Sequence, residues 1–355
     1  MSDKTEYTAY LSLTLNGKHF KGRNGLDLLI KQCEKSEEHE HRLIAQFILE
    51  WINDSDFITL QTSGSTGQAK LIKVKKSAML ASAKRTIRFF NLQANQTALL
   101  CLSAQYIAGK MMLVRAIVGG FNLITSSVSS DPLMGLNQTI DFVAMVPLQL
   151  STIVQNNIDD LSRVKKILVG GSALSTSLRD KLMQIGCEVW ESYGMTETVS
   201  HIAVRSIGEH AFRVLDGIQI SKNDQGCLVI HPSDVNETML ITTDLIELYS
   251  DFDFSLLGRL DNIINSGGVK VVPEEVEKKL QAYISNEFVI SWKSDLKLGQ
   301  KVVLVLESGS VCDVELSQLS CLSKYQIPKE MIYVDEFPRT DTGKVKRKKL
   351  QELIS

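Results

Sequence analysis

The sequence predicts an α/β protein with a large N-terminal domain and a small α+β domain at its C-terminal end. Short apolar runs alternate with helical stretches from residue 57 to residue 190, and this alternation builds a largely parallel sheet. After Gly258 the pattern changes to short strands around a few helices, which is typical of a compact α+β unit of roughly a hundred residues. The 355 residues are enough to bury one large core and a smaller one.

The N-terminal part begins with a small β element and continues as helix. Alternating leucines precede Asn16-Gly17, a dipeptide typical of a hairpin turn. Apolar residues recur at helical spacing over 26–52, which predicts one or two amphipathic helices before a strand at 57–60. Helices are then expected at 77–90, 110–118, 147–154 and 175–185, and strands at 98–102, 122–125, 142–146, 167–169 and 188–190. In the C-terminal part we expect strands at 269–272, 288–292 and 302–306, a helix opened by Pro273, and a basic final helix.

Composition excludes several classes of function. The net charge is -2 and the basic residues are spread along the chain, so we expect no nucleic-acid partner. No apolar run approaches the length of a bilayer span and the first residues lack a signal-peptide pattern, so we expect a cytoplasmic protein without membrane insertion. The six cysteines form no C-x-x-C pair, which argues against a zinc site. Composition does not indicate an oligomeric state.

A loop dense in glycine and hydroxyl groups follows the strand at 57–60. Glycines let the backbone approach phosphate oxygens, hydroxyls donate hydrogen bonds and a lysine adds a charge, so this loop can bind a polyphosphate. The spacing differs from a Walker A loop, and a loop of this composition can also be a simple connection. The candidate residues are Ser63, Gly64, Ser65, Thr66, Gly67 and Lys70.

A second block, Ser192-Tyr193-Gly194-Met195-Thr196-Glu197, follows the strand at 188–190. In this order the two blocks resemble the superfamily of adenylating enzymes that contains acyl-CoA synthetases, peptide-synthetase adenylation domains and luciferases. The resemblance runs from about residue 57 to the C-terminus. Four further regions match the family's order: 169–174, 243–244, the stretch from Gly258 through 266–277, and 338–344.

The resemblance implies an ATP-dependent ligase that works through an acyl-AMP intermediate. Residues 1–258 would form the adenylating domain that binds ATP and the acid, shortened at its N-terminus relative to the family. Residues 259–262 would form a hinge, and 263–355 a mobile α+β domain that carries the catalytic Lys344. ATP, Mg²⁺ and coenzyme A would be the co-substrates.

Roles follow position by position from the same resemblance. The glycine-rich loop would hold the outer phosphates, Thr196 the α-phosphate, and Glu197 the magnesium ion. Tyr193 would stack on adenine, and Lys344 would stabilise the adenylation transition state. The remaining candidates are Gly171, Ser172, Ser192, Gly194 and Met195 around ATP; Asp244 and Arg259 on the ribose; Asp261 as pivot; and Gly267, Gly268 and Lys270 beside the pantetheine arm of CoA. A surface ion pair of Asp244 with Arg259, solvated charge at Lys344 and a tight turn at the two glycines are the alternatives.

The acid site departs from the family pattern. Tyr106 stands where relatives have histidine, and the segment 245–257 is irregular. Within the superfamily, the short length and the sequence around 107–115 and 192–198 resemble the branch that ligates o-succinylbenzoate to CoA in menaquinone biosynthesis. This acid keeps a second carboxylate, which Arg115 and Ser200 would bind; Arg115 could instead reach solvent.

Other acids and acceptors remain open from the sequence. Another aryl or short-chain acyl-CoA ligase is one alternative. A second is an enzyme that loads a carrier protein in trans, and a third is a relative that only binds. The charge and the motif around Lys344 argue against a role in binding alone.

Overall fold

The computed structural model describes residues 7–61, 71–284, 286–309, 315–316, 319–340 and 345–355. The chain divides into two compact units: unit 1 comprises Met1–Gln219 and His231–Met239, and unit 2 comprises Ile220–Ile230 and Leu240–Ser355. The predicted boundary at 258 and the predicted hinge at 259–262 describe two domains that rotate relative to each other. A division into compact units does not test such a rotation, so both stay predictions. Among the described residues, no helix is long and apolar enough to cross a membrane.

Unit 1 is built around a sheet whose strands run in the order β11-β10-β9-β8-β7-β5-β6-β1-β2. Its strands are β1 Ser12–Leu15, β2 Lys18–Lys21, β3 Phe57–Gln61, β4 Leu71–Lys75, β5 Thr97–Leu100, β6 Asn122–Thr125, β7 Ile140–Met145, β8 Val164–Val169, β9 Glu188–Gly194, β10 His201–Ser206 and β11 Phe212–Val214. Its helices are α2 Gly22–Glu34, α3 His39–Ile52, α4 Lys76–Phe89, α5 Ile107–Gly119, α6 Pro147–Asn157 and α7 Thr176–Leu182, with 3₁₀ turns at Ile158–Arg163 and Thr196–Thr198. β3 and β4 pair separately as an antiparallel hairpin.

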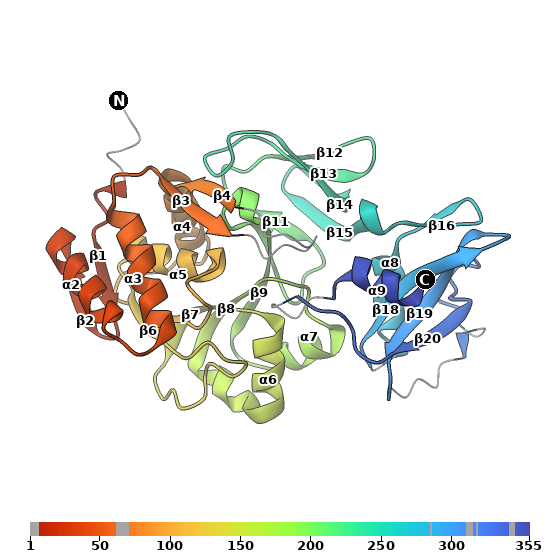
Figure 1. Ribbon diagram of the computed structural model, residues 1–355, viewed down its shortest axis with the longest axis horizontal. Helices are drawn as coiled ribbons and strands as arrows, with labels where there is room; N and C mark the ends of the chain where they lie inside the picture. Colours follow the sequence, from red (N-terminus) through yellow and green to blue (C-terminus); the bar gives the residue numbers. More distant parts are fainter. Residues whose placement is uncertain (1–6, 62–70, 285, 310–314, 317–318, 341–344) are drawn as a thin grey trace. The chain divides into compact units, whose positions relative to one another are not determined.

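The central strands β6, β5, β7, β8 and β9 are parallel, which confirms the predicted α/β class. Helices cover both faces of this sheet, with α6 and α7 on one side of β7 and β8 and with α4 and α5 on the other (Figure 1). Val143 and Met145 of β7 pack in the core that α6 and α7 close. Phe142 points the other way and meets Phe90, at the end of α4, with ring centroids 5.3 Å apart. Because both faces are covered, these strands are continuous apolar runs.

The N-terminal hairpin forms where the sequence predicts it. β1 and β2 pair with Leu15 opposite Lys18, so Asn16 and Gly17 form a two-residue turn. Their φ angles are 49° and 78°, the left-handed pair that a type I′ turn requires and that an Asn-Gly dipeptide tolerates.

Unit 2 contains two sheets. One has the antiparallel order β12-β13-β14-β15, and the other has the order β17-β16-β19-β18, with β20 parallel to β19. The strands are β12 Ile220–Lys222, β13 Cys227–Ile230, β14 Leu240–Leu248, β15 Asp253–Arg259, β16 Ile264–Ser266, β17 Val269–Val271, β18 Phe288–Asp295, β19 Gly299–Glu307 and β20 Glu330–Val334. The helices are α8 Pro273–Leu280 and α9 Arg347–Ile354, and a 3₁₀ turn spans Leu260–Asn262.

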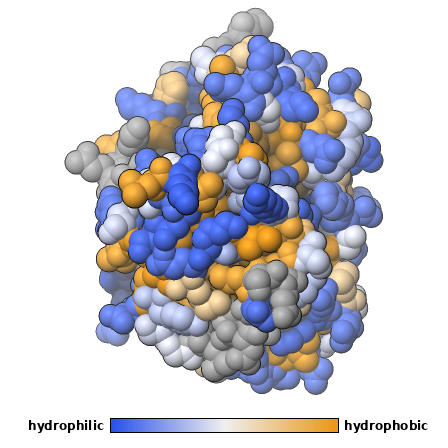
Figure 2. Space-filling view, turned by 90° about the vertical axis from the view of Figure 1, so that its right-hand side faces the viewer, coloured by the Kyte–Doolittle hydropathy of each residue, from blue (hydrophilic) through white to orange (hydrophobic). Residues whose placement is uncertain are grey.

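β19 explains how one strand supports two helices. Its residues alternate between faces, so Val302 and Leu304 pack in the core that contains α8, whereas Val303 and Val305 pack with Leu350 of α9. The segment 245–257, irregular by comparison with the family pattern, consists of parts of the paired strands β14 and β15 and the turn 249–252 between them, with a register shift between Leu245 and Ile246. Figure 2 shows one face of the molecule, on which hydrophobic residues are exposed among hydrophilic ones, as on most protein surfaces.

Candidate active site

Two of the ATP segments predicted from the sequence meet at one edge of the unit 1 sheet. β8 and β9 are parallel and Val169 lies opposite Glu191, so the loops that follow both strands leave from their carboxyl ends. The Ser192 hydroxyl donates to the Val169 carbonyl at 2.8 Å and so links the two segments. Ligands of open α/β sheets bind at this kind of edge.

The loop after β8 begins with two glycines. Gly171 has a φ of +92°, and a side chain at Gly170 would come within 3.1 Å of the Ser192 hydroxyl. Below this loop, Glu191 is buried and accepts hydrogen bonds from Arg179 at 2.6 Å and Arg205 at 2.9 Å. This paired carboxylate fixes β9 beneath the predicted adenine site, where Ser172 remains exposed.

The tyrosine predicted to stack on adenine is largely enclosed by protein. Tyr193 is 8% exposed, and its ring centroid lies 6.1 Å from that of Phe212. Gly194 has no room for a side chain, because a Cβ there would lie 2.3 Å from the Ser200 carbonyl oxygen. The chain therefore folds back tightly after β9, and the glycine has a structural reason as well as its predicted role.

The turn after β9 presents the two side chains assigned to phosphate and magnesium. Thr198 is buried, and its hydroxyl joins the backbone of Met195 at 3.1 Å to that of Ser200 at 2.9 Å. Thr196 is half-buried and Glu197 is exposed. Within the described ranges, Glu197 forms no ion pair.

Arg115 is buried inside unit 1, with 2% of its surface exposed. Its Nη2 donates to the Ser200 hydroxyl at 2.9 Å and its Nε to the Thr86 hydroxyl at 3.3 Å, while Nη1 contacts the Met112 sulfur at 3.4 Å. No ion pair with a carboxylate involves Arg115 in the part of the chain that the structure describes. Burial lowers its pKa to about 10. The alternative in which Arg115 reaches solvent is thus wrong.

Tyr106, the third predicted acid-site residue, lies at the N-terminal end of α5. It is half-buried, and its carbonyl accepts from the Lys110 amide at 3.1 Å. Over the described residues it makes no hydrogen bond to Arg115 or Ser200. The structure therefore brings together two of the three predicted acid-site residues.

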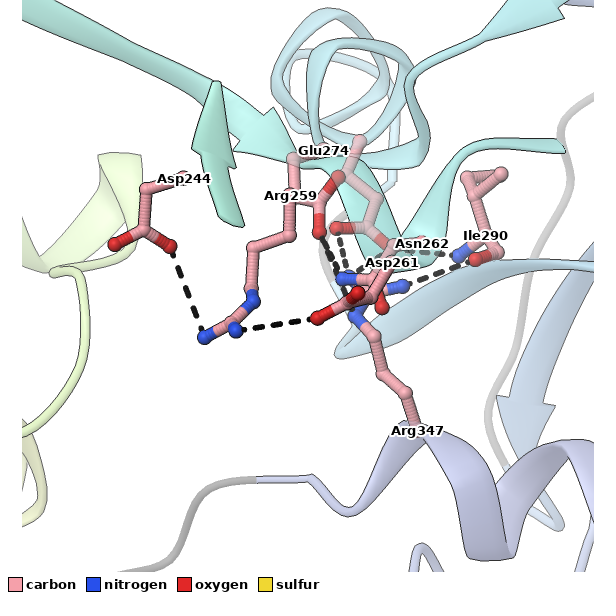
Figure 3. Close-up of polar contacts among 8 residues, drawn as sticks. Asp244, Arg259, Asp261, Asn262, Glu274, Ile290 and Arg347 are labelled. Carbon is pink, nitrogen blue, oxygen red and sulfur yellow. Dashed lines mark hydrogen bonds and ion pairs between the residues drawn. The ribbon is translucent and has the colours of Figure 1, made fainter. Parts of the chain in front are cut away.

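In unit 2, Asp244 and Arg259 lie opposite each other on β14 and β15. Figure 3 shows Arg259 between two carboxylates, 3.7 Å from Asp244 and 3.3 Å from Asp261, and it also donates to the Thr243 hydroxyl. The predicted ribose pair and the predicted pivot are thus neighbours. Ribose binding stays a prediction, since the ion pair by itself is also compatible with a surface contact.

Figure 3 also shows Arg347, the first residue of α9, directed at α8 and β18. Its Nη2 binds both oxygens of Glu277, at 2.7 and 2.6 Å, and its Nη1 donates to the Ile290 carbonyl at 3.0 Å. Arg347 Nε also lies 3.9 Å from Glu274, one turn earlier on α8, and Asn262 donates to the same Glu274 oxygen. Arg347 thus binds the start of α9, three residues after Lys344, to α8 and β18 of unit 2.

The glycines predicted to line a CoA tunnel form the turn between β16 and β17. Gly267 and Gly268 have φ angles of 61° and 83°, the type I′ pair again, and Lys270 is exposed on β17. A Cβ on Gly267 would lie 3.0 Å from Tyr325, whereas nothing lies within 4 Å of one on Gly268. The turn geometry alone favours both glycines, and their role toward CoA stays a prediction.

Several predicted residues lie outside the described residues. They are Ser63, Gly64, Ser65, Thr66, Gly67, Lys70 and Lys344. Conversely, Thr86 and His201 were not predicted, although the structure places both beside Arg115 and Ser200. The only signal for His201 in the sequence is its position directly after Ser200.

Comparison with known proteins places these residues in a family. The 2-succinylbenzoate–CoA ligase of Staphylococcus aureus strain Newman is 27% identical over 324 residues; the match covers 81% of this chain but 65% of that relative's length. A solved acyl-CoA synthetase (AMP-forming)/AMP-acid ligase II-like protein from Dyadobacter fermentans is 34% identical, with a TM-score of 0.61, over 92% of this chain and 98% of that one.

A second solved structure shares the fold at lower identity. It is the o-succinylbenzoate coenzyme A synthetase of Bacillus subtilis in complex with ATP and magnesium ion, with a TM-score of 0.71 and 23% identity over 82% of this chain and 69% of that one. The sequence model of the AMP-binding enzymes matches residues 23–229, more than half of the chain. The chain therefore belongs to the AMP-binding enzyme family.

Proposed function

We propose that this chain is an AMP-forming acid–CoA ligase that converts o-succinylbenzoate, ATP and CoA to o-succinylbenzoyl-CoA, AMP and diphosphate. Family membership and the sequence motifs support the adenylating chemistry. The names of the relatives from Staphylococcus aureus and Bacillus subtilis support this acid. The reaction would belong to menaquinone biosynthesis, and its cytoplasmic location stays a prediction.

Arg115 is the observation that most strongly supports a dicarboxylic acid as the substrate. Taking a guanidinium out of water is costly, and buried charges in proteins are normally paired with an opposite charge. Arg115 is buried and the partners that the structure describes are a serine, a threonine and a methionine, all neutral. A substrate with a second carboxylate would supply the missing anion. A planar guanidinium with free N–H groups binds carboxylates with two parallel hydrogen bonds.

The residues around β9 fit ATP and magnesium. Mg²⁺ prefers oxygen ligands and is commonly held by one or two carboxylates together with substrate phosphates, and Glu197 offers an exposed carboxylate of this kind. The ion would neutralise charge on the phosphates. Thr196 would donate to the α-phosphate, Tyr193 would pack against adenine, and Gly171 with Ser172 would border its edge. Asp244 would accept hydrogen bonds from the ribose hydroxyls.

Lys344 and the glycine-rich loop at 62–70 would complete the adenylating site. Attack of a carboxylate oxygen on the α-phosphate crowds negative charge, so a positioned lysine stabilises the transition state more than the ground state. For thioester formation we propose a rotation about Asp261 that removes Lys344 and brings Gly267, Gly268 and Lys270 to the pantetheine arm.

A panel of acids in ATP–pyrophosphate exchange, with and without CoA, tests this proposal. O-succinylbenzoate should give the highest kcat/KM. The thioester should form only when CoA is present. Better use of benzoate or a fatty acid would contradict this acid and favour another aryl or short-chain ligase. Exchange without any transfer to CoA would favour the loading of a carrier protein.

A further inference from the structure

Four side chains from three elements of unit 1 close a ring of hydrogen bonds. Arg115 of α5 contacts Ser200 at 2.9 Å, and the Ser200 hydroxyl contacts Nδ1 of His201, at the start of β10, at 3.2 Å. Nε2 of His201 lies 3.4 Å from the Thr86 hydroxyl of α4, which in turn lies 3.3 Å from Nε of Arg115. His201 and Thr86 are 6% and 0% exposed. Three of the four side chains, those of Arg115, His201 and Thr86, are thus shielded from water, and Ser200 is half-buried.

The directions of these hydrogen bonds follow from counting protons. The Thr86 hydroxyl has one proton and donates it to the Ser82 carbonyl at 3.1 Å, so it accepts from both Arg115 and His201. Nε2 of His201 therefore carries a proton, and Nδ1 accepts from the Ser200 hydroxyl. Ser200 in turn accepts from Arg115. Every contact is satisfied by one neutral tautomer of His201, and the burial of the ring, together with the charge of Arg115, holds the pKa of His201 well below its ordinary value.

A strained turn brings Ser200 to this ring. The Ser200 amide donates to the Thr198 carbonyl at 2.7 Å across Val199, whose φ and ψ are 67° and -52°. This is a γ-turn of the rare, strained kind, and a β-branched residue is unusual there. Such strain costs roughly 1–3 kcal/mol and persists where the surroundings impose it, often at functional sites. Here it directs the chain from β9 into β10 at the residue that binds Arg115.

The ring uses only part of the hydrogen-bonding capacity of Arg115. A guanidinium has five N–H groups, and the ring takes one on Nε and one on Nη2. Over the residues that the structure describes, the other groups meet no oxygen acceptor, and Nη1 has only the Met112 sulfur. The guanidinium is therefore fixed at one edge and keeps donors for an anion on the others.

We propose that His201 is a positioning residue for acid recognition: by holding the Ser200 and Thr86 hydroxyls in one arrangement, it orients the Arg115 guanidinium toward the second carboxylate of a dicarboxylic acid. This inference rests on the proposed function and adds to it a residue that determines specificity. His201 touches neither the reacting carboxylate nor ATP in this scheme, so its loss should affect recognition of the second carboxylate and leave adenylation itself intact.

The test compares His201→Phe with the wild type on two acids, o-succinylbenzoate and 4-oxo-4-phenylbutanoate, which lacks the aromatic carboxylate. Phe keeps a ring of similar size but removes both nitrogens. Each lost hydrogen bond weakens binding by about 3- to 10-fold, so KM for o-succinylbenzoate should rise by that factor or more. The kcat, the KM for ATP and the KM for the monocarboxylic acid should change by less than about twofold.

Substitutions that keep part of the His201 hydrogen bonding, and a substitution of Thr86, give independent checks. His201→Asn keeps an acceptor near Nδ1 and His201→Gln keeps a donor near Nε2, so both should be intermediate. Thr86→Val should reproduce the effect of His201→Phe. Thr152→Val is the matched control, because Thr152 also donates to a carbonyl four residues earlier, at 3.0 Å, but is only half-buried and lies on α6, away from the ring. It should leave both KM values unchanged.

The outcomes separate this inference from the proposed function. If the wild type does not prefer the dicarboxylic acid, the proposed substrate fails. If the wild type prefers it but His201→Phe and Thr86→Val leave that preference intact, or raise both KM values equally, only the role of His201 is overturned. In an Arg115→Ala background, His201→Phe should cost almost nothing further, and simple additivity of the two changes would also overturn it.

Discussion

Arg115 in unit 1 and Arg347 in unit 2 show two ways of holding a positive charge inside a protein. Arg347 binds both oxygens of Glu277 and the Ile290 carbonyl, while 28% of its side chain remains exposed. Arg115 is more deeply buried, and its partners are two hydroxyls and a sulfur.

The difference in partners appears in the pKa of each group. Burial lowers the pKa of Arg115 to about 10, and no carboxylate from the described part of the chain opposes that shift. Burial also acts on Arg347, but the charge and hydrogen bonds of Glu277 outweigh it and raise the pKa of Arg347. A paired buried charge completes the fold, whereas a charge with neutral partners is more favourable once an anion arrives. The first arrangement is structural, and we expect the second to belong to a binding site.

Lys344 would be a third kind of cation, one that acts on the transition state alone. Lys344→Ala should slow acyl-AMP formation by about a hundredfold or more, because it removes a positioned charge from the developing anion. Transfer from preformed acyl-AMP to CoA should remain nearly normal. Single-turnover measurements of the two half-reactions test this, and equal loss in both would remove the assigned role.

The unpaired arginine should matter most for the acid. Arg115→Ala should weaken binding of o-succinylbenzoate by about 10- to 100-fold, which corresponds to roughly 1.5–3 kcal/mol for a hydrogen bond to a charged group. The KM for ATP should hardly change. Arg115→Lys should recover part of the loss, since an ammonium lacks the two-pronged geometry. If the loss were the same for an analogue without the aromatic carboxylate, Arg115 would not bind that group.

The two arginines should also differ in what they contribute to stability. Arg347→Met leaves the Glu277 carboxylate, 15% exposed, without its cation and should destabilise unit 2 by about 2 kcal/mol. Arg115→Met removes a charge that has only neutral partners, so unit 1 should lose nothing or gain up to about 1 kcal/mol. Amide hydrogen exchange in α8 and β18, compared with α4 and α5, reports each unit separately. Equal destabilisation by both changes would show that Arg115 and Arg347 do not differ in their contribution to stability.

The sequence predicts the central sheet well because its strands are buried on both faces. β7 and β8 are apolar runs with clear ends, and the structure differs from the predicted bounds by a few residues. Strands such as β11 and β12 are three residues long and mix polar with apolar side chains. Their pairing is decided by partners elsewhere in the chain, so no local pattern indicates it.

The predicted acid site could also be derived from the sequence only in part. Arg115 and Ser200 could be predicted because each lies near a motif that resembles the family. The ring around them joins residues 29, 85 and 115 positions apart. Periodicity assigns Thr86 to a buried helix face but cannot say which strand residue meets it, and a histidine after a serine carries no signal of its own.

The smallest effect concerns pH and the neutral state of His201. An unfolded histidine titrates near pH 6.5, whereas the folded His201 resists protonation because it is buried and next to Arg115. Below pH 6.5 the unfolded chain therefore binds a proton that the folded chain does not, and stability falls as the pH falls, by at most about 1.4 kcal/mol per pH unit from this group.

Unit 1 of His201→Asn should lose about 1 kcal/mol less than the wild type between pH 6.5 and 5.5. Urea unfolding at both pH values measures the difference, with His39→Asn, at an exposed position of α3, as the control. Identical slopes in the wild type and His201→Asn would contradict a neutral His201 in the closed ring.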